Sequence, residues 1–186
     1  VSVNTRAAEV DPGSGIKMSI GDNSYQKFTA FHNTGVNELG WSSSFLLGFW
    51  QGDGWRNGMQ GEGTTYAFSV GYTPRGGNHE FNFSLIGAGQ WHHQAYYGTQ
   101  LQDYLDYGPV QGDDFRKFNA LYGDYQGEEF SILRNYYNKP LATFNWDWEI
   151  SSRVTLATSL YGSAGRGGGT GLRGRGSYGV SPFRES

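Results

Sequence analysis

The stretch "TTYAFSVGYT" (residues 64–73) alternates large apolar side chains with small or polar ones. Successive side chains of a β-strand point to opposite faces, so a period of two separates the two kinds of residue. One face holds Tyr66, Phe68, Val70 and Tyr72, and the other holds Thr65, Ala67, Ser69 and Gly71. A helix would scatter the same side chains around its surface. The stretch therefore predicts a strand with one large and one small face.

Three further stretches show the same alternation: "WSSSFLLGFW" (41–50), "HEFNFSLIGAGQW" (79–91) and "LATFNWDWEI" (141–150). In residues 41–50, Leu46 and Trp50 are exceptions, because these large residues fall on the face that otherwise carries small side chains. Period and turn residues together predict an all-β fold of about seven antiparallel strands. They are expected near residues 16–22, 25–34, 41–51, 65–73, 79–93, 141–150 and 154–163.

The composition supports an all-β chain and narrows the function classes. The 186 residues include 30 glycines, about twice the usual share, and 17% are aromatic, which a disordered Gly-rich chain would lack. The net charge of −3 argues against a nucleic-acid partner, which would call for a basic face. The absence of cysteine excludes a disulfide scaffold and a thiolate metal site.

The connections between the expected strands are unequal. Residues 72–80 and 149–156 form tight polar turns, whereas residues 52–64 and the segment between Gly98 and Lys139 are long. Short turns at one end and long loops at the other are typical of an outer-membrane β-barrel, whose apolar face meets lipid. Bacterial barrels usually have an even number of strands. Seven strands therefore indicate either a further strand in the Gly-rich tail or one arc of a larger barrel.

Three segments resemble TonB-dependent outer-membrane transporters. The opening "VSVNTRAAEVDPGSG" (1–15) is similar to the end of the family's plug domain, where a strand of the form I/V-I/S-V-N-T-K/R leads towards the barrel. "GDGWRNG" (52–58) is similar to the family's S-D-G-Y-R-D-N, and "WHHQAYYG" (91–98) to its H-x-x-A-W-x-G. The matching positions are Val1, Val3, Asn4, Thr5 and Arg6; Asp53, Gly54, Arg56 and Asn57, with Trp55 for Tyr and Gly52 for Ser; and His92, Ala95, Tyr96 and Gly98, with Tyr96 for Trp.

The resemblance implies a domain organisation and a function. Residues 1–14 would be the end of the plug and its linker, and residues 15–186 the first part of a transmembrane β-barrel of about 22 strands. Most of the plug and the remaining strands would lie outside this chain. Such a transporter is not an enzyme and needs no cofactor. It takes up a large or scarce nutrient (siderophore, haem, oligosaccharide or peptide) across the outer membrane, driven by the TonB–ExbB–ExbD complex. Lipopolysaccharide and a surface lipoprotein lid are the other partners it suggests.

Two other functions fit the same pattern. A small self-contained barrel of eight strands would act as an adhesin, a pore or an anchor. A soluble all-β carbohydrate-binding module would also alternate, but it would turn its apolar face inward and have short connections at both ends.

The paired histidines are the most conspicuous chemical candidates. Strand alternation sends His92 and His93 to opposite faces, so a shared metal site would need a bulge and further ligands. Together with Tyr96, Tyr97 and Arg56 they are instead expected to contact the transported ligand or, as for Trp91 and Tyr96, to belong to the aromatic belt at the membrane interface. No catalytic or metal-binding residue is expected in the chain.

The long segment 99–138 is expected to be an extracellular recognition loop rich in tyrosine. Its carboxylates also suit calcium, although their spacing does not match an EF-hand and solvated charge is the commoner role. They are Asp103, Asp106, Asp113, Asp114, Glu128 and Glu129. In the Gly-rich tail, Arg166, Arg173 and Arg175 are candidate contacts for an anionic lipid or ligand.

Overall fold

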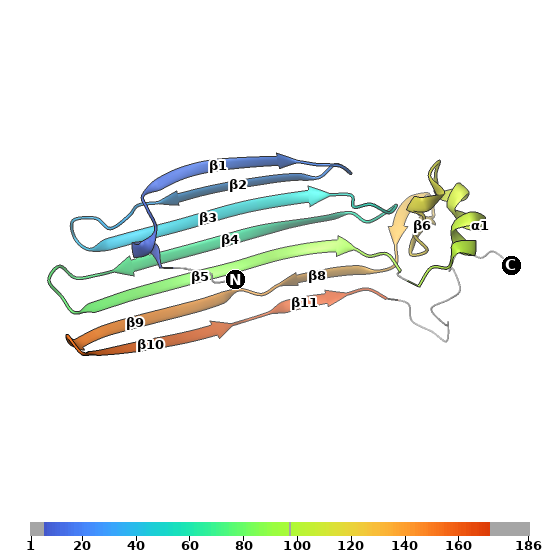
Figure 1. The fold of residues 1–186 in the computed structure, drawn as a ribbon. Coiled ribbons are helices and arrows are strands. Elements are labelled where there is room, and N and C mark those ends of the chain that lie inside the picture. The colour runs from blue at the N-terminus through green and yellow to red at the C-terminus, as the bar shows by residue number, and fades with distance from the viewer. Residues whose placement is uncertain (1–5, 97, 172–186) are drawn as a thin grey trace.

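The structure is a computed structural model that describes residues 6–96 and 98–171 (Figure 1). It consists mostly of one antiparallel β-sheet with a single short α-helix. The sheet is open, and the described residues do not close it into a barrel. The strands of the sheet are β1 (Gly13–Ile20), β2 (Gln26–Asn33), β3 (Trp41–Gly52), β4 (Gly61–Tyr72), β5 (His79–His93), β8 (Arg134–Asn138), β9 (Leu141–Ser151), β10 (Val154–Ser163) and β11 (Arg166–Gly169).

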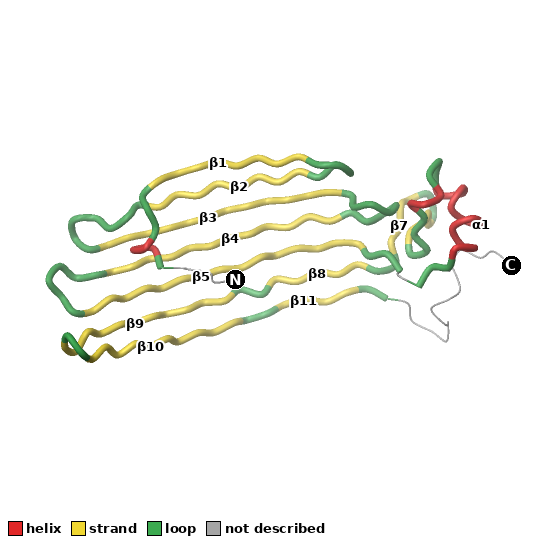
Figure 2. The backbone as a smooth tube through the Cα atoms, viewed as in Figure 1, coloured by secondary structure: helices red, strands yellow, loops and turns green. Residues whose placement is uncertain are grey.

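These nine strands form seven continuous lines, as the sequence predicts. β8 and β9 lie end to end beside β5 and keep one register, in which Gln90 pairs with Tyr137 and Ile86 with Leu141 (Figure 2). The interruption falls at Pro140, which has no backbone N–H to donate to the ladder. β10 and β11 continue each other in the same way beside β9 and β8. The Gly-rich stretch thus extends the seventh strand line to Gly169, beyond residue 163, where the sequence predicts that this line ends.

One part of the all-β prediction is wrong. Between β5 and β8 the chain forms a separate unit of α1 (Leu101–Gln111) and a hairpin of β6 (Tyr122–Tyr125) and β7 (Glu128–Ser131). A capping box starts the helix, because the Gln100 backbone N–H donates to the Asp103 carboxylate at 3.0 Å. Gly108 and Pro109, two poor helix formers, stand in its last turns and obscure it in the sequence.

The two ends of the sheet carry connections of different size. One end, the loop end, carries residues 21–25, 53–60 and the unit 94–133, while the other, the turn end, carries residues 34–40, 73–78 and 152–153. Figure 1 shows α1 and β6 gathered at the loop end, with the tight β4–β5 and β9–β10 turns opposite. None of the helices in the described residues is long and apolar enough to cross a membrane.

The two faces of the sheet differ as predicted. The large-residue face carries the aromatic side chains, and many remain exposed, including Trp41 (48%), Leu47 (58%) and Phe68 (45%). The small-residue face is buried at its centre, where Ser69, Asn82 and Ser84 are at most 6% exposed. The 3₁₀ turn η1 (Ala7–Glu9) covers this second face by packing against β3 and β4. The covered face is therefore the polar one.

Aromatic rings line up across neighbouring strands near the turn end. Trp41 pairs with Tyr72, Tyr72 with Phe81, and Phe81 with Trp146, so all four lie on the large-residue face. The rings of Trp41 and Tyr72 stack with centroids 4.5 Å apart. Cross-strand aromatic pairs of this kind stabilise a sheet.

Candidate functional site

Two adjoining cavities lie around the loop 53–60 at the loop end. The first, the aromatic pocket, has a volume of about 420 Å³. It is lined by Asp22, Asn23, Tyr25, Trp50, Met59, His92 and His93 together with Gly21, Gly52, Gly54 and Gly61. The second, the polar pocket, has a volume of about 350 Å³. It is lined by Asn23, Asp53, Gly54, Trp55, Arg56, Asn57, Gly58, Gln60, Gln111, Lys117, Tyr122 and Glu129. Asn23 and Gly54 line both cavities, so the aromatic pocket and the polar pocket adjoin each other.

Glycines on β4 shape the aromatic pocket. A Cβ at Gly63 would lie 2.6 Å from Nε1 of Trp50, and a Cβ at Gly61 would lie 2.9 Å from Cβ of His92. Both distances are shorter than side chains tolerate, so the two glycines leave the space that Trp50 and His92 occupy. This explains why Trp50 breaks the alternation: on the small-residue face it packs over glycine.

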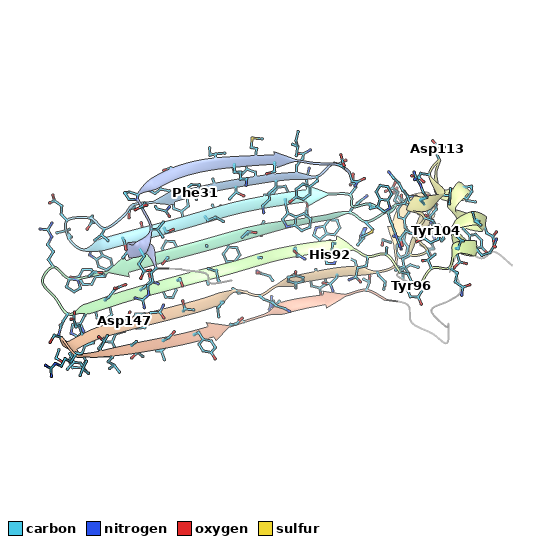
Figure 3. All side chains as sticks on the ribbon, in the orientation of Figure 1. Phe31, His92, Tyr96, Tyr104, Asp113 and Asp147 are labelled. Atoms are coloured by element: carbon cyan, nitrogen blue, oxygen red, sulfur yellow. The ribbon has the colours of Figure 1, made fainter. Side chains whose placement is uncertain are left out.

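The two histidines lie on opposite faces of β5, as strand alternation predicts. His92 pairs with Gly61 on the small-residue face and lines the aromatic pocket (Figure 3). The His93 ring lies 5.3 Å from that of Trp91, and its Nδ1 lies 3.2 Å from the Gly58 carbonyl oxygen. Among residues 6–96 and 98–171, no three His, Asp or Glu side chains come together in a way that could hold a metal ion.

Arg56 links the loop 53–60 to the segment that follows β5 and to α1. Its Nη1 donates to the Tyr96 carbonyl oxygen at 2.9 Å, and its guanidinium lies 5.7 Å from the Tyr104 ring centroid. Arg56 also lines the polar pocket, so the same side chain joins the segments and borders a cavity. Tyr97, the fifth expected ligand contact, lies outside the described residues.

The rest of the 52–58 motif holds the loop on the inserted unit. The Asn57 backbone N–H donates to the Lys117 carbonyl at 2.9 Å, and its side chain donates to the Gln111 carbonyl at 3.3 Å. Gly54 and Gly58 have positive φ angles of 71° and 68°, a region that favours glycine. The motif therefore builds a defined loop, with Asp53 and the exposed Trp55 facing the polar pocket.

Asn119 is the centre of this region and is not among the residues predicted from the sequence. It is 0% exposed, and its Nδ2 donates to the carbonyls of Asn57 at 2.9 Å and Gln94 at 3.4 Å. Its Oδ1 accepts from the Leu121 N–H at 3.1 Å. The Gln111 side chain in turn holds the Asn119 backbone. Its Oε1 accepts from the Asn119 N–H at 3.0 Å, and its Nε2 donates to the Asn119 carbonyl at 2.9 Å. Nothing in the local sequence separates this asparagine from an ordinary loop residue.

The polar pocket carries charges of both signs. Asp53, Glu129, Arg56 and Lys117 all line it, and the Lys117 ammonium lies 5.4 Å from the Trp55 ring centroid. Burial raises the pKa of the Tyr122 phenol to about 12, and its hydrogen bond to the Glu129 carboxylate acts in the same direction. Balanced charges, amides and an exposed indole suit a polar ligand with many hydrogen-bonding groups.

Three of the acidic residues of the segment 99–138 have local partners. Asp103 caps α1, Asp106 accepts from Gln102 at 2.7 Å, and Asp114 pairs with Arg116 at 2.8 Å. The Arg116 guanidinium holds the pKa of Asp114 below its usual range. Gathered calcium ligands are therefore absent from the described part of this segment.

No protein-family model matches the chain, and comparisons with curated proteins and with solved structures find no match either.

Proposed function

We propose that the chain is part of a TonB-dependent outer-membrane transporter that takes up a large or scarce nutrient, such as a siderophore, haem, an oligosaccharide or a peptide. The observation that carries the proposal is which face of the sheet is covered: the polar face is covered and the apolar face is exposed, the opposite of the arrangement in a soluble protein. The chain's N-terminal segment lies on the small-residue face, while the aromatic face is left uncovered. A transmembrane barrel with a plug inside it would use its two faces in this way.

Charged and polar contacts hold the N-terminal segment on the small-residue face. The Arg6 guanidinium lies between two carboxylates, with Nη1 at 2.9 Å from Glu80 Oε1 and 2.5 Å from Asp147 Oδ2. The Ala7 backbone N–H donates to Asn82 Oδ1 at 3.2 Å. A polar inner wall with a basic segment bound to it fits the end of a plug entering its barrel.

The large-residue face suits a lipid environment. On β3 it runs from Trp41 to Phe49, eight residue steps, which corresponds to about 27 Å along the strand. Strand tilt would reduce this to about 20 Å of height, close to the apolar band of outer-membrane barrels, which aromatic girdles flank. A soluble protein of this size rarely exposes so large an apolar surface, which disfavours the carbohydrate-binding module.

The free edges of the sheet support one arc of a larger barrel. Within residues 6–96 and 98–171, β1 pairs only with β2, and the β10–β11 line pairs only with β9 and β8. Unpaired strand edges are costly in hydrocarbon, so each would need a further strand. A barrel of about 22 strands would supply these neighbours, and the TonB–ExbB–ExbD complex would act through the plug.

The aromatic and polar pockets are the proposed ligand contacts of the arc. Both lie at the loop end, which would face the outside of the cell, and together they offer Trp50, His92 and Trp55 beside charged groups. A surface lipoprotein lid would close over the same end. The site binds its ligand and carries out no chemical step on it.

The experiment is uptake by cells that produce the transporter, with a panel of ferric siderophores, haem, oligosaccharides and peptides as probes. The protein should appear in the outer-membrane fraction, and a protonophore should abolish uptake of the substrate found. Trp50→Ala and His92→Ala should each reduce uptake about tenfold, the equivalent of one lost contact of roughly 1.4 kcal/mol, with unchanged amounts in the membrane.

The matched control for His92 is His32→Ala, because His32 lies on the large-residue face, bonded to Ser14 Oγ at 2.7 Å. It should leave uptake unchanged. Recovery of the protein in the soluble fraction, or uptake that persists with the proton gradient collapsed, contradicts the proposal.

A further inference from the structure

Residues 6–12 join the N-terminal segment to the sheet at the turn end, directly before the first strand. Energised uptake through the plug would put tension on this segment, because the proposed plug precedes it in the chain. We infer that residues 6–12, the anchor, transfer this tension to the inner strands of the sheet and keep it away from the edge strand β1. The inference rests on the proposed function.

β1 is the strand that the tension would otherwise reach. Within the described part of the chain it pairs only with β2, through eight residue pairs that begin with Gly13 and Asn33 at the turn end. A pull on Gly13 towards the turn end acts along the strand, so these pairs alone would resist it. A slip of β1 along β2 would change the register of the strand and expose unpaired backbone groups to hydrocarbon.

The ionic part of the anchor divides the tension between two inner strands. Glu80 on β5 and Asp147 on β9 pair directly across the sheet. Arg6 Nη1 lies 2.9 Å from Glu80 Oε1 and 2.5 Å from Asp147 Oδ2. All three side chains are partly buried, so their attraction is screened less by water than that of an exposed surface pair. A pull on Arg6 is therefore shared by two strands.

The packed part of the anchor adds two more strands. Ala7 is 1% exposed, and its backbone N–H donates to Asn82 Oδ1 at 3.2 Å. The turn η1 packs against β3 and β4, where a Cβ at Gly71 would lie 3.6 Å from the Ala8 backbone nitrogen (Figure 1). The anchor thus contacts β3, β4, β5 and β9. Each of these strands is paired on both sides, unlike β1.

The link from the anchor to β1 is stiff and lies against the sheet. A Cβ at Gly35 in the β2–β3 turn would lie 3.2 Å from three atoms of the Pro12 ring, so the ring packs closely on this glycine. Gly35 has a positive φ angle of 66°, which favours glycine. Proline also fixes its own φ angle. The first residue of β1 is therefore held in place independently of the segment before the anchor.

The test pulls on the N-terminus of single transporter molecules, held in a surface-fixed bilayer, at constant force with magnetic tweezers. The unchanged protein should release the seven residues 6–12 in one step of about 24 Å, at about 3.4 Å per residue, while β1 stays paired. Arg6→Gln should shorten the dwell time before this step about tenfold, because two neighbouring carboxylates lose their cation.

Salt separates an electrostatic anchor from a merely packed one. High salt should shorten the dwell time of the unchanged protein and leave that of Arg6→Gln nearly unaltered, because only the unchanged protein has the ion cluster to screen. This series tests the inference on the unchanged protein even if Arg6→Gln does not assemble. A dwell time of the unchanged protein that does not depend on salt overturns the inference.

The control is Arg153→Gln, because Arg153 lies in the exposed β9–β10 turn at the same end of the sheet. It removes the same charge and should leave the dwell time unchanged. Equal dwell times for the unchanged protein and Arg6→Gln overturn the inference, as does a first step of about 50 Å, which would include β1. A protein that fails to enter the outer membrane overturns the proposed function instead, so the two failures are distinguishable.

Discussion

Asn119 has no exposed surface, although asparagine is usually an exposed residue. Its side chain joins three backbone groups from three segments, those of Asn57, Gln94 and Leu121. A single buried amide therefore fixes the 52–58 motif, the end of β5 and the inserted unit relative to one another. At this scale prediction from sequence is weakest, because a buried and an exposed asparagine look alike until the fold brings their partners together.

Replacing Asn119 by Ala should loosen the inserted unit without unfolding the sheet. The change leaves two part-buried carbonyls and one buried N–H without this partner, which should cost about 3 kcal/mol. Hydrogen exchange should show faster exchange across residues 94–133 and unchanged protection in β3 and β4. Asn78→Ala is the control, because the side chain of this exposed asparagine donates one hydrogen bond, to the Glu149 carbonyl at 2.9 Å. Equal protection in both variants would show that Asn119 does not hold the unit.

Tyr122 gives the inserted unit a defined response to alkaline pH. Its pKa is raised from 10.0 to about 12, so the neutral phenol is the form that the fold favours. A raised folded pKa contributes stability that is complete below pH 10 and is lost as the pH rises through 12. NMR of ring-labelled tyrosine should show one phenol titrating near pH 12, and Tyr122→Phe should remove that signal. Titration of Tyr122 near pH 10 would contradict the assignment.

At the scale of elements, strands were predictable and the helix was not. The period of two identifies seven strand lines, because large apolar side chains gather on one face of most strands and small or polar ones on the other. The exception at Trp50 is resolved only by the glycines opposite it on β4. The helix α1 has Gly108 and Pro109 in its last turns, so its sequence resembles a loop. The beginning of the sixth strand line at Arg134 was also missed, because Pro140 interrupts the pattern.

The N-terminal segment is held by one cation between two anions. Arg6→Gln should release residues 6–10 from the small-residue face, because Glu80 and Asp147 would then repel each other with no compensating charge. All three side chains are about a quarter exposed, so we expect a cost of about 1–2 kcal/mol, below that of a fully buried pair. Hydrogen exchange at the Ala7 N–H should accelerate at least tenfold.

Arg75→Gln provides the control for this change, since Arg75 lies in the exposed β4–β5 turn. It should leave exchange at Ala7 unaltered. If exchange at Ala7 is equally fast in the unchanged protein and in Arg6→Gln, the ion cluster does not hold the segment.

At the scale of the whole molecule, the arrangement of the two faces carries the functional argument. The sequence predicts an alternating sheet, but it does not tell which face is covered, since a soluble sandwich and a membrane barrel alternate alike. The structure shows that the N-terminal segment covers the polar face. The sequence predicts only part of the candidate site. His92 and Arg56 were expected and do border the pockets, whereas the roles of Asn119 and Gln111 depend on contacts between distant segments.

The environment of the two faces can be measured directly, because the chain contains no cysteine. Single cysteines carrying a nitroxide label would be placed at Leu47 and Phe68 on the large-residue face, and at Leu46 and Ala67 on the small-residue face. In the outer membrane, labels at 47 and 68 should be accessible to oxygen and shielded from a water-soluble nickel complex. Labels at 46 and 67 should show the reverse. Water access at 47 and 68 equal to that at 46 and 67 would contradict a lipid-facing aromatic surface, and with it the proposed transporter.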